Sequence, residues 1–143
     1  MTGLTRIAHW AARGALGLIF LYAGLIKAGA SEQFLIALMP FTFLPPGSLL
    51  VVALVLPWVE IAAGGAMFFP RVWRAAAAVL GILSLVFAGV LLWALASGII
   101  VSCGCFGTDD EPSAAKMLLA AVRDILLAAI AARLVFHRSG RSS

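Results

Sequence analysis

The chain has 143 residues, of which 64% are hydrophobic and 11% are charged, and its mean hydropathy is +1.12. This apolar share lies far above the about 45–50% typical of soluble proteins, which excludes an ordinary soluble domain. The net charge of +4 does not indicate nucleic-acid binding, because the basic residues are dispersed at the ends of apolar runs and form no nucleic-acid motif. The sequence instead predicts a single all-α integral membrane domain over residues 1–143.

Four apolar runs reach the length of about 20 residues that a helix needs to cross the hydrocarbon core. They predict a four-transmembrane-helix bundle with spans near 10–29, 48–69, 72–100 and 113–136 and outer loops at 30–47 and 101–112. The first run follows Arg6 and precedes a signal-peptide-like Ala28-Gly29-Ala30, but we interpret it as an uncleaved helix. Within it, Arg13 is expected to snorkel toward the headgroups, with Trp10 in the interface.

Other residues predict local structure. Pro57 predicts a kink in the second span, and Ser113 is a favourable N-cap for the fourth. The segment 33–44 is apolar but too short to span, and we expect it to lie at the interface or dip back into the membrane. Small residues of the third span, where helices can approach closely, are Gly81, Ser84, Gly89 and Ser97.

Positive charges predict the orientation of the bundle. They gather at the two chain ends and in the loop between the second and third spans, as Arg6, Arg13, Arg71, Arg74, Arg133, Arg138 and Arg141. By the positive-inside rule, both termini are then cytoplasmic. The loop at 101–112 would face the periplasmic, oxidising side of a bacterial inner membrane.

The two cysteines of the chain, Cys103 and Cys105, flank Gly104 in this outer loop. The simplest structural explanation is a pair of small buried thiols at a helix end. A bridge between them would close almost no loop and would be strained, which makes it a poor crosslink but a readily exchanged disulfide. The dipole at the carboxyl end of the preceding helix disfavours a thiolate at Cys103, so we favour Cys105 as the more reactive thiol. The pattern predicts a dithiol–disulfide redox pair.

Two other functions remain open for the same loop. Two thiolates can bind a soft ion such as Cu(I), as in a copper-type transporter or metallochaperone. A closed zinc site needs four ligands, and both His9 and His137 lie on the predicted cytoplasmic side, so zinc is not expected. A third hypothesis is a scaffold that holds a partner enzyme at the membrane.

Four ionisable residues of the predicted spans stand out as candidates for the bundle interior, namely Lys27, Glu60, Arg123 and Asp124. A charge near the bilayer centre costs at least about 2.5–3.5 kcal/mol on insertion scales, so such residues usually face the bundle interior and pair. At about 1.5 Å per residue, Glu60 lies roughly 15 Å from the inner boundary and Lys27 and Arg123 roughly 20 Å. Long side chains close that gap, which predicts that Glu60 pairs with Lys27 or Arg123.

These charged residues admit two interpretations. In the structural one, the pairs fix helix register and do no chemistry. In the functional one, Lys27 or Arg123 orients a quinone carbonyl or stabilises a developing anion, while Glu60 transfers protons. Glu60 is then a candidate catalytic residue, and Lys27, Arg123 and Asp124 are candidate cofactor-binding residues.

Several motifs together resemble the MauE branch of the DoxX-like membrane proteins. They are Arg13-Gly14 with Gly17, Phe20, Gly24 and Lys27; Leu56-Pro57-Trp58 with Glu60 and Gly64; Cys103-Gly104-Cys105-Phe106-Gly107; and Arg123-Asp124. The resemblance covers nearly the whole chain, and the C-G-C-F-G string is its most specific part. It implies a four-helix, redox-associated membrane protein.

The MauE branch is associated with maturation of the disulfide-rich small subunit of methylamine dehydrogenase, alongside a thioredoxin-like partner. Other DoxX relatives are linked to thiosulfate and quinone oxidation or to thiol stress. The resemblance therefore implies disulfide exchange between the Cys103–Cys105 pair and a thioredoxin-like protein, with a membrane quinone as the candidate cofactor. Disulfide-generating quinone reductases relay electrons between two cysteine pairs, whereas this sequence has one.

Overall fold

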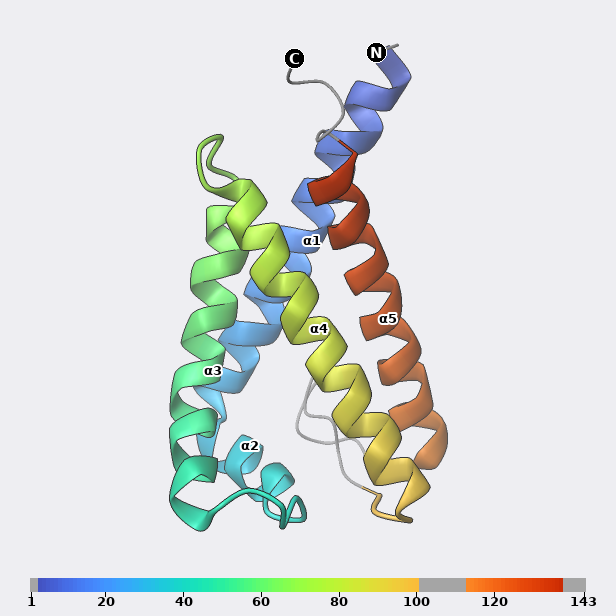
Figure 1. The fold of residues 1–143 in the computed structure, drawn as a ribbon. Helices are drawn as coiled ribbons and strands as arrows, with labels where there is room; N and C mark the ends of the chain where they lie inside the picture. Colours follow the sequence, from blue (N-terminus) through green and yellow to red (C-terminus); the bar gives the residue numbers. More distant parts are fainter. Residues whose placement is uncertain (1–2, 101–112, 138–143) are drawn as a thin grey trace.

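The computed structural model describes residues 3–100 and 113–137, and its regular elements there are all helices (Figure 1). This confirms the predicted all-α class. The helices are α1 (Gly3–Gly29), α2 (Ser31–Leu38), α3 (Pro46–Ala66), α4 (Trp73–Ala96) and α5 (Ala114–Phe136). Three of them, α1, α3 and α4, are long and apolar enough to cross a membrane. The chain is therefore a multi-pass membrane protein.

The long helices form two antiparallel pairs, α1 with α3 and α4 with α5 (Figure 1). Contacts within each pair are more extensive than contacts between the pairs. The short α2 lies where α1 ends and packs mainly against α3. The turn from α3 to α4 lies at the opposite end of the bundle, the end that also carries the start of α1 and the end of α5 (Figure 1).

Backbone capping explains why α4 ends at Ala96, before the boundary near residue 100 that the apolar run predicts. Gly98 adopts a φ of 75°, and its N–H donates to the Leu95 carbonyl. The next N–H, of Ile99, donates to the Ala94 carbonyl. This is a Schellman motif, in which glycine is favoured because it has no Cβ to strain the left-handed conformation. Apolar residues after it therefore extend the hydrophobic run without extending the helix.

The other helix boundaries follow ordinary rules. α1 begins at Gly3, well before the predicted boundary near residue 10, because the segment preceding the apolar run contains no proline and continues the helix. Ser113 caps α5 as predicted, since its hydroxyl accepts from the Lys116 N–H at 3.2 Å. α3 begins on Pro46, a favoured first-turn residue, and continues through the fully buried Pro57.

The segment after α1 packs against the bundle with two aromatic side chains. Phe34 of α2 is buried, and Phe41 of the following loop is buried in a small apolar cluster with α4 and α5. That cluster consists of Phe41, Leu91, Ala94, Met117 and Ala121. The short apolar segment thus covers this end of the protein interior.

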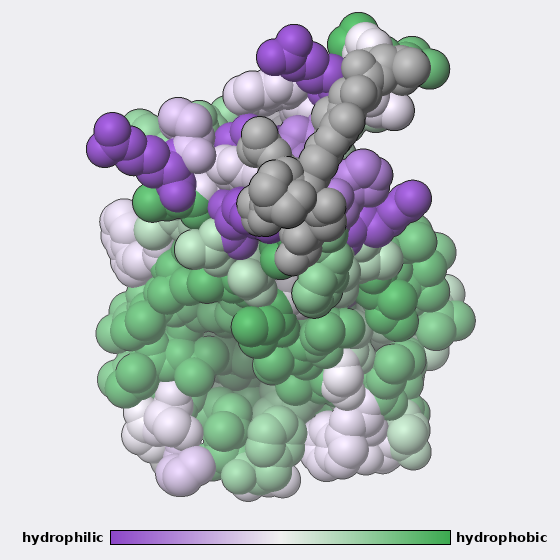
Figure 2. Space-filling model, turned by 45° about the horizontal axis from the view of Figure 1, so that its top comes forward, coloured by the Kyte–Doolittle hydropathy of each residue, from purple (hydrophilic) through white to green (hydrophobic). Residues whose placement is uncertain are grey.

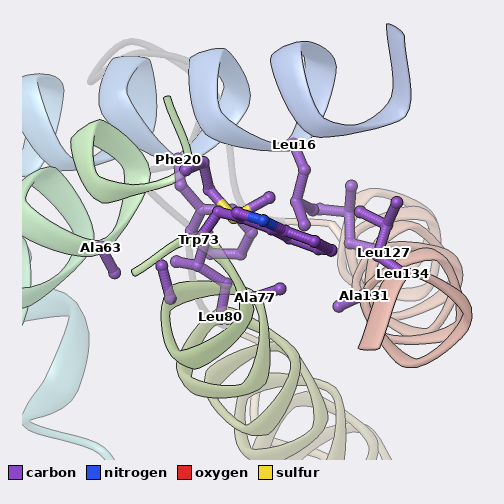
Figure 3. Close-up of a cluster of buried hydrophobic side chains, with 11 residues drawn as sticks. Leu16, Phe20, Ala63, Trp73, Ala77, Leu80, Leu127, Ala131 and Leu134 are labelled. Atoms are coloured by element: carbon purple, nitrogen blue, oxygen red, sulfur yellow. The ribbon is translucent and has the colours of Figure 1, made fainter. Parts of the chain in front are cut away.

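The larger apolar cluster lies toward the other end and joins α1, α3, α4 and α5 (Figure 3). Trp73, at the start of α4, is 3% exposed and lies among side chains from the other long helices. The members are Leu16, Phe20, Ala63, Met67, Trp73, Ala76, Ala77, Leu80, Leu127, Ala131 and Leu134. This cluster holds the two helix pairs together.

Arg13 does not snorkel to the surface as predicted but is buried in the protein. Its guanidinium donates to the Met67 carbonyl at 2.7 Å and lies 4.5 Å from the ring centroids of both Trp10 and Trp73. Met67 is the C-cap of α3, where carbonyl groups lack partners within the helix. Arg13 therefore satisfies the end of α3 and ties it to α1 and α4.

The outer surface fits contact with lipid. Hydrophobic side chains cover most of the face seen in Figure 2, whereas hydrophilic side chains gather at the end that carries the α3–α4 turn. Exposed apolar residues occur on each of the four long helices, including α5, with Leu18, Leu54, Leu85 and Leu126 as examples. The predicted contact with the lipid bilayer is consistent with this surface.

Small residues serve the packing of the two helix pairs. A Cβ added at Gly81 would lie 3.1 Å from the Cβ of Ala131, so this predicted close approach is present between α4 and α5. Nothing lies within 4 Å of a Cβ added at Gly89, where the prediction was wrong. The closest backbone approach made by a glycine of the described chain is between α1 and α3 and involves Gly17, Gly24 and Gly64.

Candidate functional site

Four buried polar side chains form one layer of the bundle interior, between the two apolar clusters. On each of α3, α4 and α5, a polar residue lies one helical turn from a member of the larger cluster and so shares its face. These residues are Glu60, Ser84 and Asp124, next to Ala63, Leu80 and Leu127 respectively. With Lys27 of α1, they are all at most 4% exposed, and we call these four residues the polar layer.

Lys27 and Glu60 form a buried ion pair within this layer. Lys27 Nζ lies 2.8 Å from Glu60 Oε1, and the side chains are 4% and 1% exposed. Of the two partners predicted for Glu60, the structure shows Lys27. Because a lone charge in hydrocarbon is costly, each residue gives the other a partner of opposite charge at this depth.

Two aromatic rings enclose the Lys27 ammonium group. Its Nζ lies 4.6 Å from the ring centroid of Phe87 on α4 and 5.4 Å from that of Phe34 on α2. Aromatic faces attract cations, and the attraction is stronger where water is excluded. The ion pair is therefore held by four elements, because α2 and α4 add rings to the charges on α1 and α3.

Arg123 and Asp124 form the second charged pair, on α5. The Arg123 guanidinium donates from Nη2 and Nε to Asp124 Oδ1, at 2.8 and 3.1 Å. Measured on the side chains alone, Asp124 is 6% exposed and Arg123 is 26% exposed. Adjacent residues on a helix normally face apart, so this contact requires the long arginine side chain to fold back onto its neighbour.

The two pairs form one electrostatic group. Glu60 interacts with Asp124 and Arg123 through the interior, and Asp124 interacts with Lys27. Two cations and two carboxylates sum to zero charge, which is the arrangement that a low-dielectric interior tolerates best. The four ionisable residues singled out in the sequence are thus brought together, on three different helices.

Neither Cys103 nor Cys105 lies within the described residues, so the redox pair stays a prediction from the sequence. The argument for Cys105 as the more reactive thiol does change. α4 ends at Ala96, and a helix dipole acts only within about the last turn, so the dipole gives no reason to prefer either cysteine.

Sequence reasoning missed three contributors to this region. Phe34 and Phe87 were not singled out, because an aromatic residue in an apolar run gives no sign that it contacts a cation. Ser84 was predicted as a small packing residue, but its hydroxyl lies within the polar layer. A polar residue within a nearly polar-free span was the available signal, since such residues tend to face the bundle interior.

The fold and this interior define the chain as an all-α, multi-pass membrane protein with ion pairs inside its helical bundle. The sequence profile described as "Methylamine utilisation protein MauE" matches residues 5–137. The chain belongs to the MauE family, which confirms the resemblance seen in its motifs.

A curated relative supports this family assignment. The chain is 34% identical over 123 residues to the "Methylamine utilization protein MauE" of Paracoccus denitrificans. The matched region covers 85% of this chain and 65% of that protein, so the chain spans about two thirds of the relative's length. No solved structure matches the chain.

Proposed function

We propose that the protein is a membrane thiol–disulfide oxidoreductase component that acts in the maturation of extracytoplasmic proteins, with Cys103 and Cys105 as its redox pair. The observation that carries this proposal is the Cys-Gly-Cys motif, the sole cysteines of a chain from the MauE family. The name of the Paracoccus relative suggests methylamine utilisation as the setting. A thioredoxin-like protein on the periplasmic side is the proposed exchange partner.

The reaction is a two-electron exchange. The thiolate of one cysteine attacks a partner disulfide and releases one partner thiolate, which gives a mixed disulfide. The second cysteine then attacks its neighbour's sulfur, so that the Cys103–Cys105 disulfide forms and the partner leaves as a dithiol. The chain has lost two electrons and two protons, which the partner has gained. In the reverse direction, the chain's disulfide oxidises the partner.

A membrane quinone is the proposed coupled redox partner. A quinone accepts two electrons and two protons to become a quinol, which matches the oxidation of one dithiol. Within the described residues, Lys27 has one hydrogen-bond partner, Glu60, which leaves N–H groups that suit a carbonyl oxygen. Lys27, Arg123 and Asp124 are therefore the proposed cofactor-binding residues, and Glu60 is the proposed proton-transfer residue.

The proposed orientation has four spans, with α5 as the fourth and both termini cytoplasmic. α5 carries four charged residues, but it packs along α4, keeps Asp124 inside and exposes leucines such as Leu119 and Leu126. This face is compatible with lipid. The arginine-rich helix ends then lie in the cytoplasm, and the cysteine loop lies outside.

This orientation predicts which introduced cysteines a membrane-impermeant maleimide reaches. In a Cys103→Ser/Cys105→Ser background, Arg71→Cys and His137→Cys are each expected to react only after the cells are permeabilised. The native cysteines of the unmodified chain, once reduced, are expected to react in intact spheroplasts. Labelling of His137→Cys but not of Arg71→Cys in intact spheroplasts would show that α5 does not cross the membrane, and labelling of both would show the opposite orientation.

The redox proposal predicts a covalent intermediate. The single variants Cys103→Ser and Cys105→Ser are each expected to remove disulfide exchange, and the one that retains the attacking thiol should accumulate a mixed disulfide with the partner. Mass spectrometry of the species that dithiothreitol releases would identify the partner. The double variant is the control, because it has no sulfur to trap.

Three results would contradict the redox proposal. In the first, alkylation trapping finds that the cysteines never change oxidation state in cells grown with and without oxidant. In the second, the reduced, purified protein contains stoichiometric copper that Cys105→Ser loses, which would indicate a metal transporter or metallochaperone. In the third, the double variant keeps full activity in the cell, which would indicate a scaffold.

A further inference from the structure

Two oxygen atoms of the polar layer lack hydrogen-bond partners in the part of the chain that the structure describes. They are Glu60 Oε2 and Ser84 Oγ, and both residues are 1% exposed. Glu60 uses its other oxygen to bind Lys27. An unsatisfied polar group in the hydrocarbon region is strongly unfavourable, and in native proteins such groups are bonded to protein or to bound molecules.

Ser84 lies on the side of α4 that is turned toward the ion pair. It precedes Phe87 by three residues, so the two side chains share a face of the helix. The ring of Phe87 lies 4.6 Å from Lys27 Nζ, and that nitrogen is 2.8 Å from Glu60 Oε1. The serine hydroxyl therefore belongs to the same interior region as the carboxylate.

The chemistry of these groups identifies the molecule that suits them. A carboxylate oxygen only accepts hydrogen bonds, a serine hydroxyl both donates and accepts, and the Lys27 ammonium has three N–H groups of which one goes to Glu60. A buried water needs two to four polar partners, and this set supplies them. A metal ion suits the region poorly, because the described residues contain no group of three or more His, Cys, Asp or Glu side chains that could hold one.

We propose that the polar layer binds water through Glu60 Oε2 and Ser84 Oγ, and that this water carries protons to and from Glu60. The water donates one hydrogen bond to Oε2 and accepts one from the serine hydroxyl. Glu60 thereby gains a proton-transfer partner that its ion pair does not supply. The proton-carrying role rests on the proposed function, whereas the binding of water does not.

The sign of the stability change in Ser84→Ala tests this water. If Ser84 holds no water, alanine removes an unsatisfied hydroxyl and is the better helix former, so the melting temperature should rise. If the water is present, alanine deprives it of a partner and leaves Oε2 less well satisfied. We therefore expect Ser84→Ala to lower the melting temperature of the full-length protein in detergent or lipid.

The matched background is the double variant Lys27→Met/Glu60→Met, which removes the carboxylate and its counter-ion together. There we expect Ser84→Ala to raise the melting temperature, because the hydroxyl has lost the site that it serves. A rise in both backgrounds would overturn the proposal, since it would show an unbonded hydroxyl. An equal fall in both would also overturn it, since it would show that Ser84 acts only by packing.

A second measurement detects the water directly, even where a variant folds poorly. X-ray radiolysis of the native protein in lipid nanodiscs generates hydroxyl radicals from bound water, and these oxidise adjacent side chains. We expect oxidation of Phe87, several-fold reduced in Ser84→Ala, and none of Phe20 in the apolar cluster. An unoxidised Phe87 in the native protein would overturn the proposal.

Neither measurement involves thiol exchange, so the two proposals fail separately. If the cysteines prove inactive while the stability signs and the radiolysis pattern hold, the redox function is wrong and the water stands. If the cysteines exchange disulfides while Ser84→Ala is stabilising, the function stands and the water is wrong.

Discussion

The single variant Lys27→Met is expected to lower the free energy of unfolding by about 3–5 kcal/mol. Within the described chain, Lys27 is the ion-pair partner of Glu60, and that carboxylate is 1% exposed. Removing the lysine leaves an uncompensated negative charge inside the bundle. The double variant Lys27→Met/Glu60→Met should recover most of the loss, because well-packed apolar side chains of similar volume replace buried ion pairs at little or no cost.

Denaturant titration in detergent micelles measures both variants. Arg71→Met is the control, since Arg71 is exposed in the turn between α3 and α4 and its removal should change stability by no more than about 0.5 kcal/mol. A single variant no less stable than this control would mean that the charge of Glu60 is not confined to the interior. A double variant as unstable as Lys27→Met would mean that the cation–ring contacts, rather than the ion pair, dominate.

The double variant also separates the structural from the functional interpretation of the Lys27–Glu60 ion pair. If the pair only fixes helix register, the folded double variant should keep quinone-dependent turnover at the native rate. If Lys27 binds quinone or Glu60 transfers protons, the double variant should fold and yet lose that turnover. The stability and turnover of one protein preparation therefore decide between a structural and a functional role.

The pairing in the polar layer was partly predictable, because a charge buried in a membrane needs a partner of opposite charge. Depth along each helix placed Glu60 near both Lys27 and Arg123, so either could be that partner. Depth alone did not select Lys27, since the choice depends on how each helix is rotated about its axis. That rotation is set by tertiary packing, such as the contact of Phe87 with the lysine.

Arg13 shows where sequence reasoning fails for a physical reason. An arginine near the end of an apolar run ordinarily reaches the headgroups, because water solvates it better than hydrocarbon does. Here the Met67 carbonyl and two indole rings replace that solvation. Two of these three partners lie more than fifty residues away in the chain, so no local sequence pattern predicts them.

The close contact between α1 and α3 depends on glycine. A Cβ built at Gly64 would lie 2.9 Å from the carbonyl oxygen of Gly17 and 3.0 Å from the backbone nitrogen of Leu21. A Cβ built at Gly24 would lie 2.9 Å from the carbonyl oxygen of Pro57. These neighbours are backbone atoms, which cannot move aside without separating the helices. Small residues allow such approach in membranes, where packing and not water exclusion drives helix association.

Gly64→Ala is therefore expected to lower the free energy of unfolding by about 1–3 kcal/mol, the usual cost of overpacking a tight contact. Gly65→Ala is the matched control on the same helix, because nothing lies within 4 Å of its added Cβ. That variant should gain up to about 1 kcal/mol from the better helix propensity of alanine.

The two substitutions are chemically identical and adjacent, so opposite signs in one denaturant titration would isolate the contact. Equal effects would show that α1 and α3 lie farther apart than the structure has them. Because Lys27 and Glu60 lie on these same two helices, separation at Gly64 should also reduce the difference in stability between Lys27→Met and the unmodified chain.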